Sequence, residues 1–186
     1  RITVGPTAED PRGMEQRFLC SIVFRRMLRK SVDDVDPELL WAAAAAGLQN
    51  QDGRARSEIG KIYNQLSYQE IRPLLPAIHQ AIVNPAPSGI MFADGVRLKG
   101  LHLFAKHRIA EGIPLCFAFL DLERWNKRSR IAKCLDALEM YGAAAQPMLP
   151  QLKQLKIDLT NHWEARGLQP LIERTEALIK KIGSAT

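Results

Sequence analysis

Residues 130–147 read RIAKCLDALEMYGAAAQP, a stretch that begins with an arginine and ends with a proline. The same separation of 17 residues occurs three times, from Arg56 to Pro73, from Arg97 to Pro114 and from Arg130 to Pro147. Apolar residues follow each arginine at the intervals that are typical of amphipathic helices. Arginines that recur after 41 and then 33 residues indicate stacked helical hairpins. The sequence therefore predicts an all-α fold, a right-handed α-solenoid of helical hairpins.

The chain of 186 residues is expected to form one domain after a short linker. Residues 1–11 have no periodicity and contain prolines and a glycine, so they are expected to be the linker. Residues 12–186 are expected to form a single repeat domain of about eight helices, in which 158–186 serve as the C-terminal cap. The chain begins at Arg1 without an initiator methionine, which we interpret as a part of a larger protein.

Each proline of the repeat is expected to open a helix, because proline needs no backbone N–H there and has a helical φ. Each arginine is expected to lie near the start of the preceding helix. An acidic or amide residue precedes each of them and is expected to serve as an acceptor in a ladder between neighbouring repeats. The ladder consists of Arg56, Arg97 and Arg130 with Asp52, Asp94 and Asn126. In particular, Arg97 is predicted to be at least half buried and bonded to a carboxylate or a backbone carbonyl of a neighbouring hairpin.

The pairs Ala55-Arg56, Val96-Arg97 and Ser129-Arg130, each followed by a proline of the repeat, resemble the short variant of the HEAT-repeat family. The resemblance covers roughly residues 36–157 and implies a stack of HEAT-like hairpins without implying an activity. A second resemblance lies in residues 50–56, in the Ala93–Arg97 turn and in Tyr141-Gly142. These stretches are similar to the helical C-terminal part of large uncharacterised bacterial multidomain proteins, which would imply an exported protein.

The net charge of +6 and the isoelectric point of about 9.4 suit acidic partners or nucleic acid, although a solvated basic surface is the simpler interpretation. The candidate polyanion-binding residues are Arg124, Lys127, Arg128 and Lys133. Lys127 and Arg128 are expected in the first turn of a helix, where free N–H groups also attract anions. The alternative is that Arg130 belongs to the ladder and its basic neighbours are only solvated.

Three adjacent apolar residues, Ile90, Met91 and Phe92, end the longest interruption of the helical pattern. We expect them in a loop, where they either fold over the core or form a contact site for a partner.

No motif for a metal, a cofactor or a nucleophile with its base is present in the sequence. Cys20, Cys116 and Cys134 lie in apolar helical patterns and are expected to be buried, unreactive thiols. A disulfide between Cys116 and Cys134 is the alternative. No apolar run approaches the roughly 18 residues that a membrane helix needs.

The sequence thus favours a non-catalytic binding or scaffold module whose partner is a protein or peptide, with a polyanion or nucleic acid as a further possibility. The alternative is an enzyme of the DNA glycosylase type, which removes damaged bases on a HEAT-like stack. Asp121 and Glu123 beside Trp125 are the group on which such an activity would depend. The competing interpretation of Trp125 is an anchor that packs between hairpins.

Overall fold

The computed structural model describes residues 36–63, 66–87 and 90–184, together with 19, 21–23 and 25–26. The expected linker and Cys20 lie outside these residues. In the described part every regular element is helical and no strand occurs. The chain forms two compact units, Arg1–Gly100 and Leu101–Thr186, and the boundary falls inside helix α6, Ile90–Lys106.

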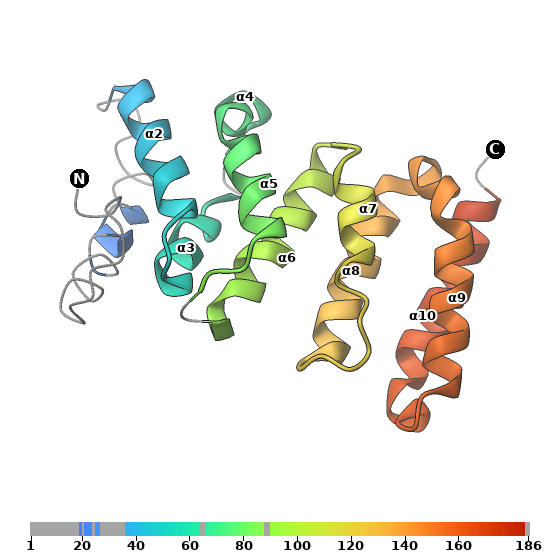
Figure 1. Ribbon diagram of the computed structural model, residues 1–186. Helices are drawn as coiled ribbons and strands as arrows, with labels where there is room; N and C mark the ends of the chain where they lie inside the picture. Colours follow the sequence, from blue (N-terminus) through green and yellow to red (C-terminus); the bar gives the residue numbers. More distant parts are fainter. Residues whose placement is uncertain are drawn as a thin grey trace. The chain divides into compact units, whose positions relative to one another are not determined.

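The first unit is built on helices that follow one another in short connections (Figure 1). They are α2 (Pro37–Leu48), α3 (Gly53–Gly60), α4 (Tyr68–Ile71), the 3₁₀ turn η3 (Arg72–Leu74), α5 (Leu75–Val83) and the first part of α6. Helix α2 packs against α3 and α5. The core between them is aliphatic, and its most deeply buried members include Leu48, Ile59, Ile71, Leu74, Ile78 and Ile82.

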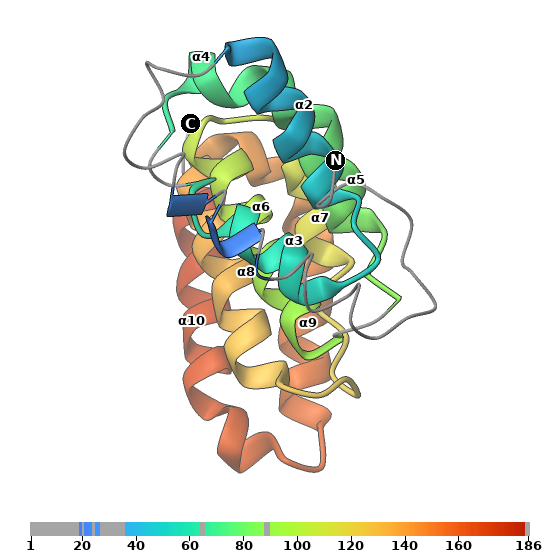
Figure 2. The ribbon, with the colours of Figure 1, turned by 90° about the vertical axis from the view of Figure 1, so that its left-hand side faces the viewer.

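The second unit contains α7 (Gly112–Phe117), α8 (Lys127–Tyr141), the 3₁₀ segment η4 (Gly142–Met148), α9 (Leu149–Asn161) and α10 (Ala165–Gly183). Helices α9 and α10 form an antiparallel hairpin, and α10 also packs against α8 (Figure 2). The apolar face of α10 supplies Leu168, Leu178 and Ile182 to the core. The expected cap boundary at residue 158 therefore falls inside α9, because the apolar positions of α9 continue to the buried Leu159.

The prolines of the repeat lie close to the helix starts but seldom at them. Pro73 and Pro147 fall in the 3₁₀ segments, and α5 and α9 begin two residues later with Pro76 and Pro150 in their first turns. Pro114 is the third residue of α7. Pro73 and Pro147 thus precede the α-helix starts by two residues instead of opening those helices. Pro73 fits there because it stands in the first positions of η3, where N–H groups are unpaired, whereas Pro147 lies inside η4.

The start of α6 corrects the sequence interpretation of residues 90–95. The segment Ile90–Phe92 belongs to the first turn of α6 and is not a loop, and Asp94-Gly95 lies within the same helix instead of forming a turn. A glycine inside a helix costs about 1 kcal/mol relative to alanine. Helix α6 tolerates Gly95 because Val96 and the apolar residues after it are buried in the core. The side chains of Ile90, Met91, Phe92 and Asp94 lie outside the described part.

The three arginines of the repeat are buried and donate to backbone carbonyls, either near the C-terminal end of a helix or in the segment that follows one. Arg56, Arg97 and Arg130 are 8%, 7% and 1% exposed. Arg97 Nε donates to the carbonyl oxygen of Ile82 in the last turn of α5, at 2.6 Å. The expectation that Arg97 is buried and bonded to a carbonyl is therefore confirmed. A carbonyl in the last turn of a helix has no partner inside that helix and lies at the negative end of its dipole, so a cation is favoured there.

Two of the expected ladder acceptors, Asp52 and Asn126, have other roles among the described residues, whereas the Asp94 side chain lies outside them. The Asp52 carboxylate caps α3 by accepting from the backbone N–H of Arg54, and it forms an ion pair with the Arg54 guanidinium at 2.9 Å. Asn126 has a left-handed backbone, with φ at 58°, and its side chain makes no cap hydrogen bond. The sequence pattern identified the buried donors correctly but assigned Asp52 and Asn126 the wrong role.

Replacing Arg97 with alanine should destabilise the protein by about 1–3 kcal/mol, because the carbonyl of Ile82 loses its donor in a buried place. Urea unfolding followed by circular dichroism measures this free energy. Arg72→Ala is the control, since Arg72 is exposed and the change should stay within about 0.5 kcal/mol. A loss below about 0.5 kcal/mol for Arg97→Ala would contradict a structural role for the repeated arginine.

Candidate functional site

The segment between α7 and α8 is folded around one side chain, Arg130. Its Nε donates to the carbonyl oxygen of Phe119 at 2.8 Å, and its Nη1 donates to that of Trp125. Its Nη2 donates to the carbonyl oxygens of Asp121 and Arg124. Because the carbonyls turn inward to the guanidinium, the segment can present its side chains to solvent.

The polar side chains of this segment and its tryptophan are exposed, whereas Phe119 and Leu120 are buried. Trp125 is 71% exposed, so the interpretation of Trp125 as an anchor packed between hairpins is wrong. The reason is that Arg130 holds Trp125 by its carbonyl group and not by its ring. Asp121 accepts a hydrogen bond from the backbone N–H of Glu123 at 2.9 Å, and both carboxylates face solvent.

Lys127, in the first turn of α8, is engaged with the loop between α9 and α10. Its Nζ lies 2.6 Å from the Glu164 carboxylate and 5.4 Å from the centre of the Trp163 ring. The ammonium group thus forms an ion pair on one side and a cation–π contact on the other. The predicted polyanion-binding role of Lys127 competes with these internal contacts.

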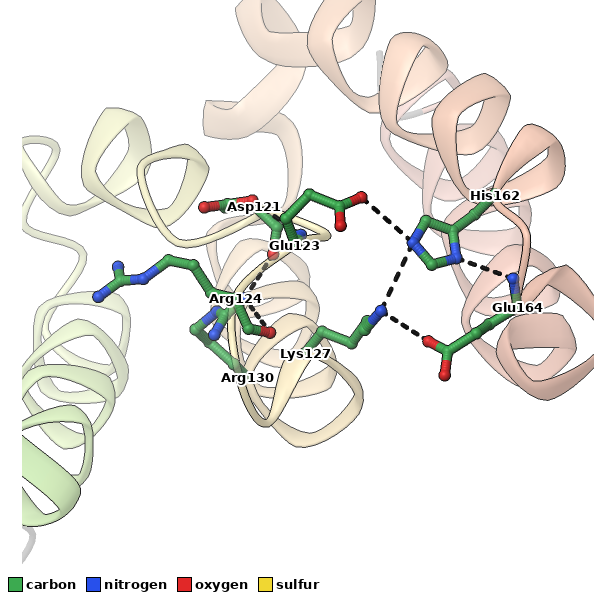
Figure 3. A network of polar contacts seen from close by, with 7 residues as sticks. All are labelled: Asp121, Glu123, Arg124, Lys127, Arg130, His162 and Glu164. Atoms are coloured by element: carbon green, nitrogen blue, oxygen red, sulfur yellow. Dashed lines mark hydrogen bonds and ion pairs between the residues drawn. The ribbon is translucent and has the colours of Figure 1, made fainter.

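His162 completes the connection between the two segments. Its ring is stacked on Trp163 with 5.5 Å between centroids, and its side chain is 5% exposed. Its Nδ1 accepts from the backbone N–H of Glu164 at 3.0 Å, and its Nε2 lies 3.5 Å from Lys127 Nζ. Nε2 lies 3.5 Å from the Glu123 carboxylate (Figure 3). Two loops that are far apart in the sequence are therefore held together.

Each of these bonded loops carries an exposed tryptophan. Trp163 is 81% exposed, even more than Trp125. We call the exposed side chains of Arg124, Trp125 and Trp163 on these loops the tryptophan surface. Tryptophan and arginine are the residues that most often carry the binding energy of protein interfaces. The sequence interpretation missed Trp163, His162 and Glu164, although an unpatterned His-Trp-Glu between two amphipathic stretches is a signal that could have found Trp163.

The remaining predicted basic residues are distributed around α8. Arg124, Arg128 and Lys133 are exposed. The Arg128 guanidinium lies directly over the backbone of Gly167 at the start of α10, where a Cβ atom on residue 167 would lie 2.3 Å from Arg128 Nη2. Among the predicted basic residues, Lys127 and Arg128 thus contact the α9–α10 hairpin from α8.

The described residues contain no group of three or more metal-ligating side chains. Cys116 and Cys134 are buried free thiols, which confirms their predicted burial and leaves no disulfide between them. Burial, reinforced by the neighbouring Cys134, raises the pKa of the Cys116 thiol. A thiol with a raised pKa is a poor nucleophile.

A second surface of the same unit is a groove between α9 and α10 with a volume of about 480 Å³. Ile157 and Ile179 line it, and Lys153, Lys156 and Lys180 lie around them. Glu176 forms ion pairs with Lys156 and Lys180, which leaves a mainly polar rim. The groove contains no aromatic residue and is a weaker candidate than the tryptophan surface.

Comparison with protein-family models, with curated proteins and with solved structures finds no match to this chain. Within the described residues, no helix combines the length and the apolar character needed to cross a bilayer. The function is therefore argued from the geometry of the two loops.

The ion pair of Lys127 with Glu164 should make stability depend on acidic pH. The hydrogen bond from Lys127 holds the pKa of Glu164 below its ordinary value of 4.5. A lowered pKa in the folded state contributes stability that is present above pH 4.5 and is lost as the pH falls through the folded pKa. The free energy of unfolding, measured with urea, should fall less for Glu164→Gln than for wild type as the pH goes from neutral to strongly acidic.

Glu173→Gln is the matched control for this measurement, because Glu173 lies on the same helix and bonds to Gln169 without a cationic partner in the described part. Its pH profile should follow that of wild type. If the unfolding free energies of wild type and Glu164→Gln changed with pH in parallel, the ion pair would contribute nothing to the pH dependence of stability.

Proposed function

We propose that this chain is a non-catalytic binding module of HEAT-like helical hairpins, and that it binds a protein or peptide through the tryptophan surface. The observation that carries the proposal is the exposure of Trp125 and Trp163, at 71% and 81%, on two loops that are bonded to each other. A solenoid architecture is part of the proposal. It is supported by the repeated arginine, which binds helix ends in both units.

The energetic argument concerns the two exposed rings. Burying a tryptophan removes about 150–250 Å² from water, which corresponds to roughly 4–6 kcal/mol per ring at about 25 cal/mol per Å². In the isolated chain most of the surface of both rings stays in water. A complex with a partner that covers both rings would be stabilised by their burial. The loops are already ordered by Arg130 and Lys127, so binding would require little further ordering.

The charges beside the rings favour a protein partner over a polyanion. Glu123 and Glu164 lie within the same two loops as Lys127, and Glu164 neutralises it. A mixed-charge rim around aromatic residues is typical of protein interfaces. For the base-removing enzyme, Asp121 and Glu123 are exposed carboxylates that do not line the groove between α9 and α10.

Peptides selected from a displayed random library on the wild-type protein should depend on the two tryptophans. The Trp125→Ala/Trp163→Ala variant should bind the selected peptides at least about 30-fold more weakly in fluorescence anisotropy, because truncation of a central aromatic residue costs about 2 kcal/mol or more. The unfolding free energy should change little, because both rings are exposed.

Leu39→Ala is the control for this experiment, since Leu39 is also a large exposed apolar residue, at 68%, but lies on α2 of the first unit. It should leave peptide affinity unchanged. Selected peptides that bind the double tryptophan variant as tightly as wild type would overturn the proposal.

The polyanion possibility has its own test, retention on a heparin column. Arg124→Glu/Lys133→Glu should lower the salt concentration of elution, because each lost cation reduces counterion release. These two residues are chosen in place of Lys127, whose replacement would also break the ion pair with Glu164. Unchanged elution of the double variant would exclude these residues as a polyanion-binding patch.

A further inference from the structure

Arg56 differs from Arg130 in how completely its guanidinium is bonded. Its Nε donates to the carbonyl oxygen of Asn50 just beyond α2, and its Nη1 donates to that of Asn84 at the end of α5, at 2.7 Å. Its Nη2 has no hydrogen-bond partner among the residues that the structure describes. In Arg130, all three nitrogens donate to carbonyls.

The charge of Arg56 has no carboxylate partner in the described part of the chain. Asp52 is paired with Arg54, and Glu58 is paired with Arg25 at 2.7 Å and with Lys61. Burial lowers the pKa of Arg56 and raises that of the neighbouring Tyr63 phenol, which therefore stays neutral. The helix ends at α2 and α5 supply only about half a negative charge each. A buried guanidinium usually has a full anionic partner.

Arg56 lines a cavity of about 330 Å³ within the first unit. The other lining residues are Leu48, Gln49, Gln80, Ala81 and Asn84. Asn84 Nδ2 donates to Gln80 Oε1 at 2.8 Å, so the amide nitrogen of Gln80 keeps both of its N–H groups for another acceptor. The cavity thus combines unused donors of Arg56 and Gln80 with an apolar wall from Leu48 and Ala81.

We propose that this cavity is a binding site for a single carboxylate group on a short aliphatic stem. Nη2 of Arg56 and the amide nitrogen of Gln80 would donate to the carboxylate, and Leu48 and Ala81 would contact the stem. Arg56 is the only cation among the lining residues, so the cavity matches one negative charge better than the two of a phosphate. The volume fits a group the size of an amino-acid side chain.

Two sources can supply this chemistry, an acidic side chain of a peptide and the α-carboxylate at the end of a chain. The site is formed by the first unit alone, whereas the tryptophan surface belongs to the second. The outcome of a binding test on the carboxylate site is thus independent of whether the tryptophan surface binds a partner.

Nuclear magnetic resonance of the full chain labelled with ¹⁵N-arginine observes the Nε–H group of Arg56 directly. N-acetyl-glutamate α-amide supplies a side-chain carboxylate, N-acetyl-alanine supplies an α-carboxylate, and N-acetyl-glutamine α-amide is the neutral isostere. At least one carboxylate should shift the Arg56 signal in a saturable manner, and the one that binds tighter identifies the source. No saturable shift, or an equal shift with the neutral isostere or with sodium chloride, would overturn the proposal.

Gln80→Ala tests the second donor without removing the buried arginine. The affinity for the carboxylate should fall about tenfold, as expected for a hydrogen bond to a charged group. Gln69→Ala, an exposed glutamine on α4 outside the cavity, should leave the affinity unchanged. Arg56→Lys should abolish the binding if the variant folds. An affinity of Gln80→Ala equal to that of wild type would contradict the assigned geometry.

Discussion

The rest of the structure depends on one repeated interaction, the donation of a buried arginine to backbone carbonyls at the end of a neighbouring helix or in the segment after it. Arg56 binds carbonyls beyond α2 and at the end of α5, Arg97 binds one in the last turn of α5, and Arg130 binds the segment after α7. The last carbonyls of a helix have no partner within it, and burying them unpaired is costly. An arginine from the next hairpin satisfies them and fastens the two elements together.

The same interaction determines what the surface presents. Where the guanidinium is fully used, as in Arg130, it binds several carbonyls of one segment, and the polar side chains of that segment and Trp125 are exposed. The exposed Trp125 is a consequence of this arrangement. Where the guanidinium is only partly used, as in Arg56, its remaining N–H groups are available to the adjoining cavity. The same repeated arginine thus has different surroundings, a bonded segment with an exposed tryptophan at Arg130 and a cavity at Arg56.

Several basic side chains also make contacts inside the molecule. The chain is basic, yet several cations near α8 are occupied inside the molecule, since Lys127 is paired with Glu164 and Arg128 lies over Gly167. The Lys127–Glu164 pair is partly exposed, at 18% and 28% for the two side chains, and it fixes the position of the loop that carries Trp163. Net charge alone therefore says little about the partner.

The sequence by itself determined the helices, their approximate repeat and the burial of the arginines. Apolar spacing specifies an amphipathic helix locally, and an arginine within that spacing must be carried into the interior. Only the tertiary structure decided which acceptors Arg56, Arg97 and Arg130 use. Every residue has a main-chain carbonyl, so residue types do not identify the one that accepts. It also decided that α6 begins at Ile90, where core packing outweighs the cost of Gly95. The contacts of Glu123 with His162 and of Lys127 with Trp163 depend on how α8 and the α9–α10 hairpin pack, so no local pattern could have predicted these contacts.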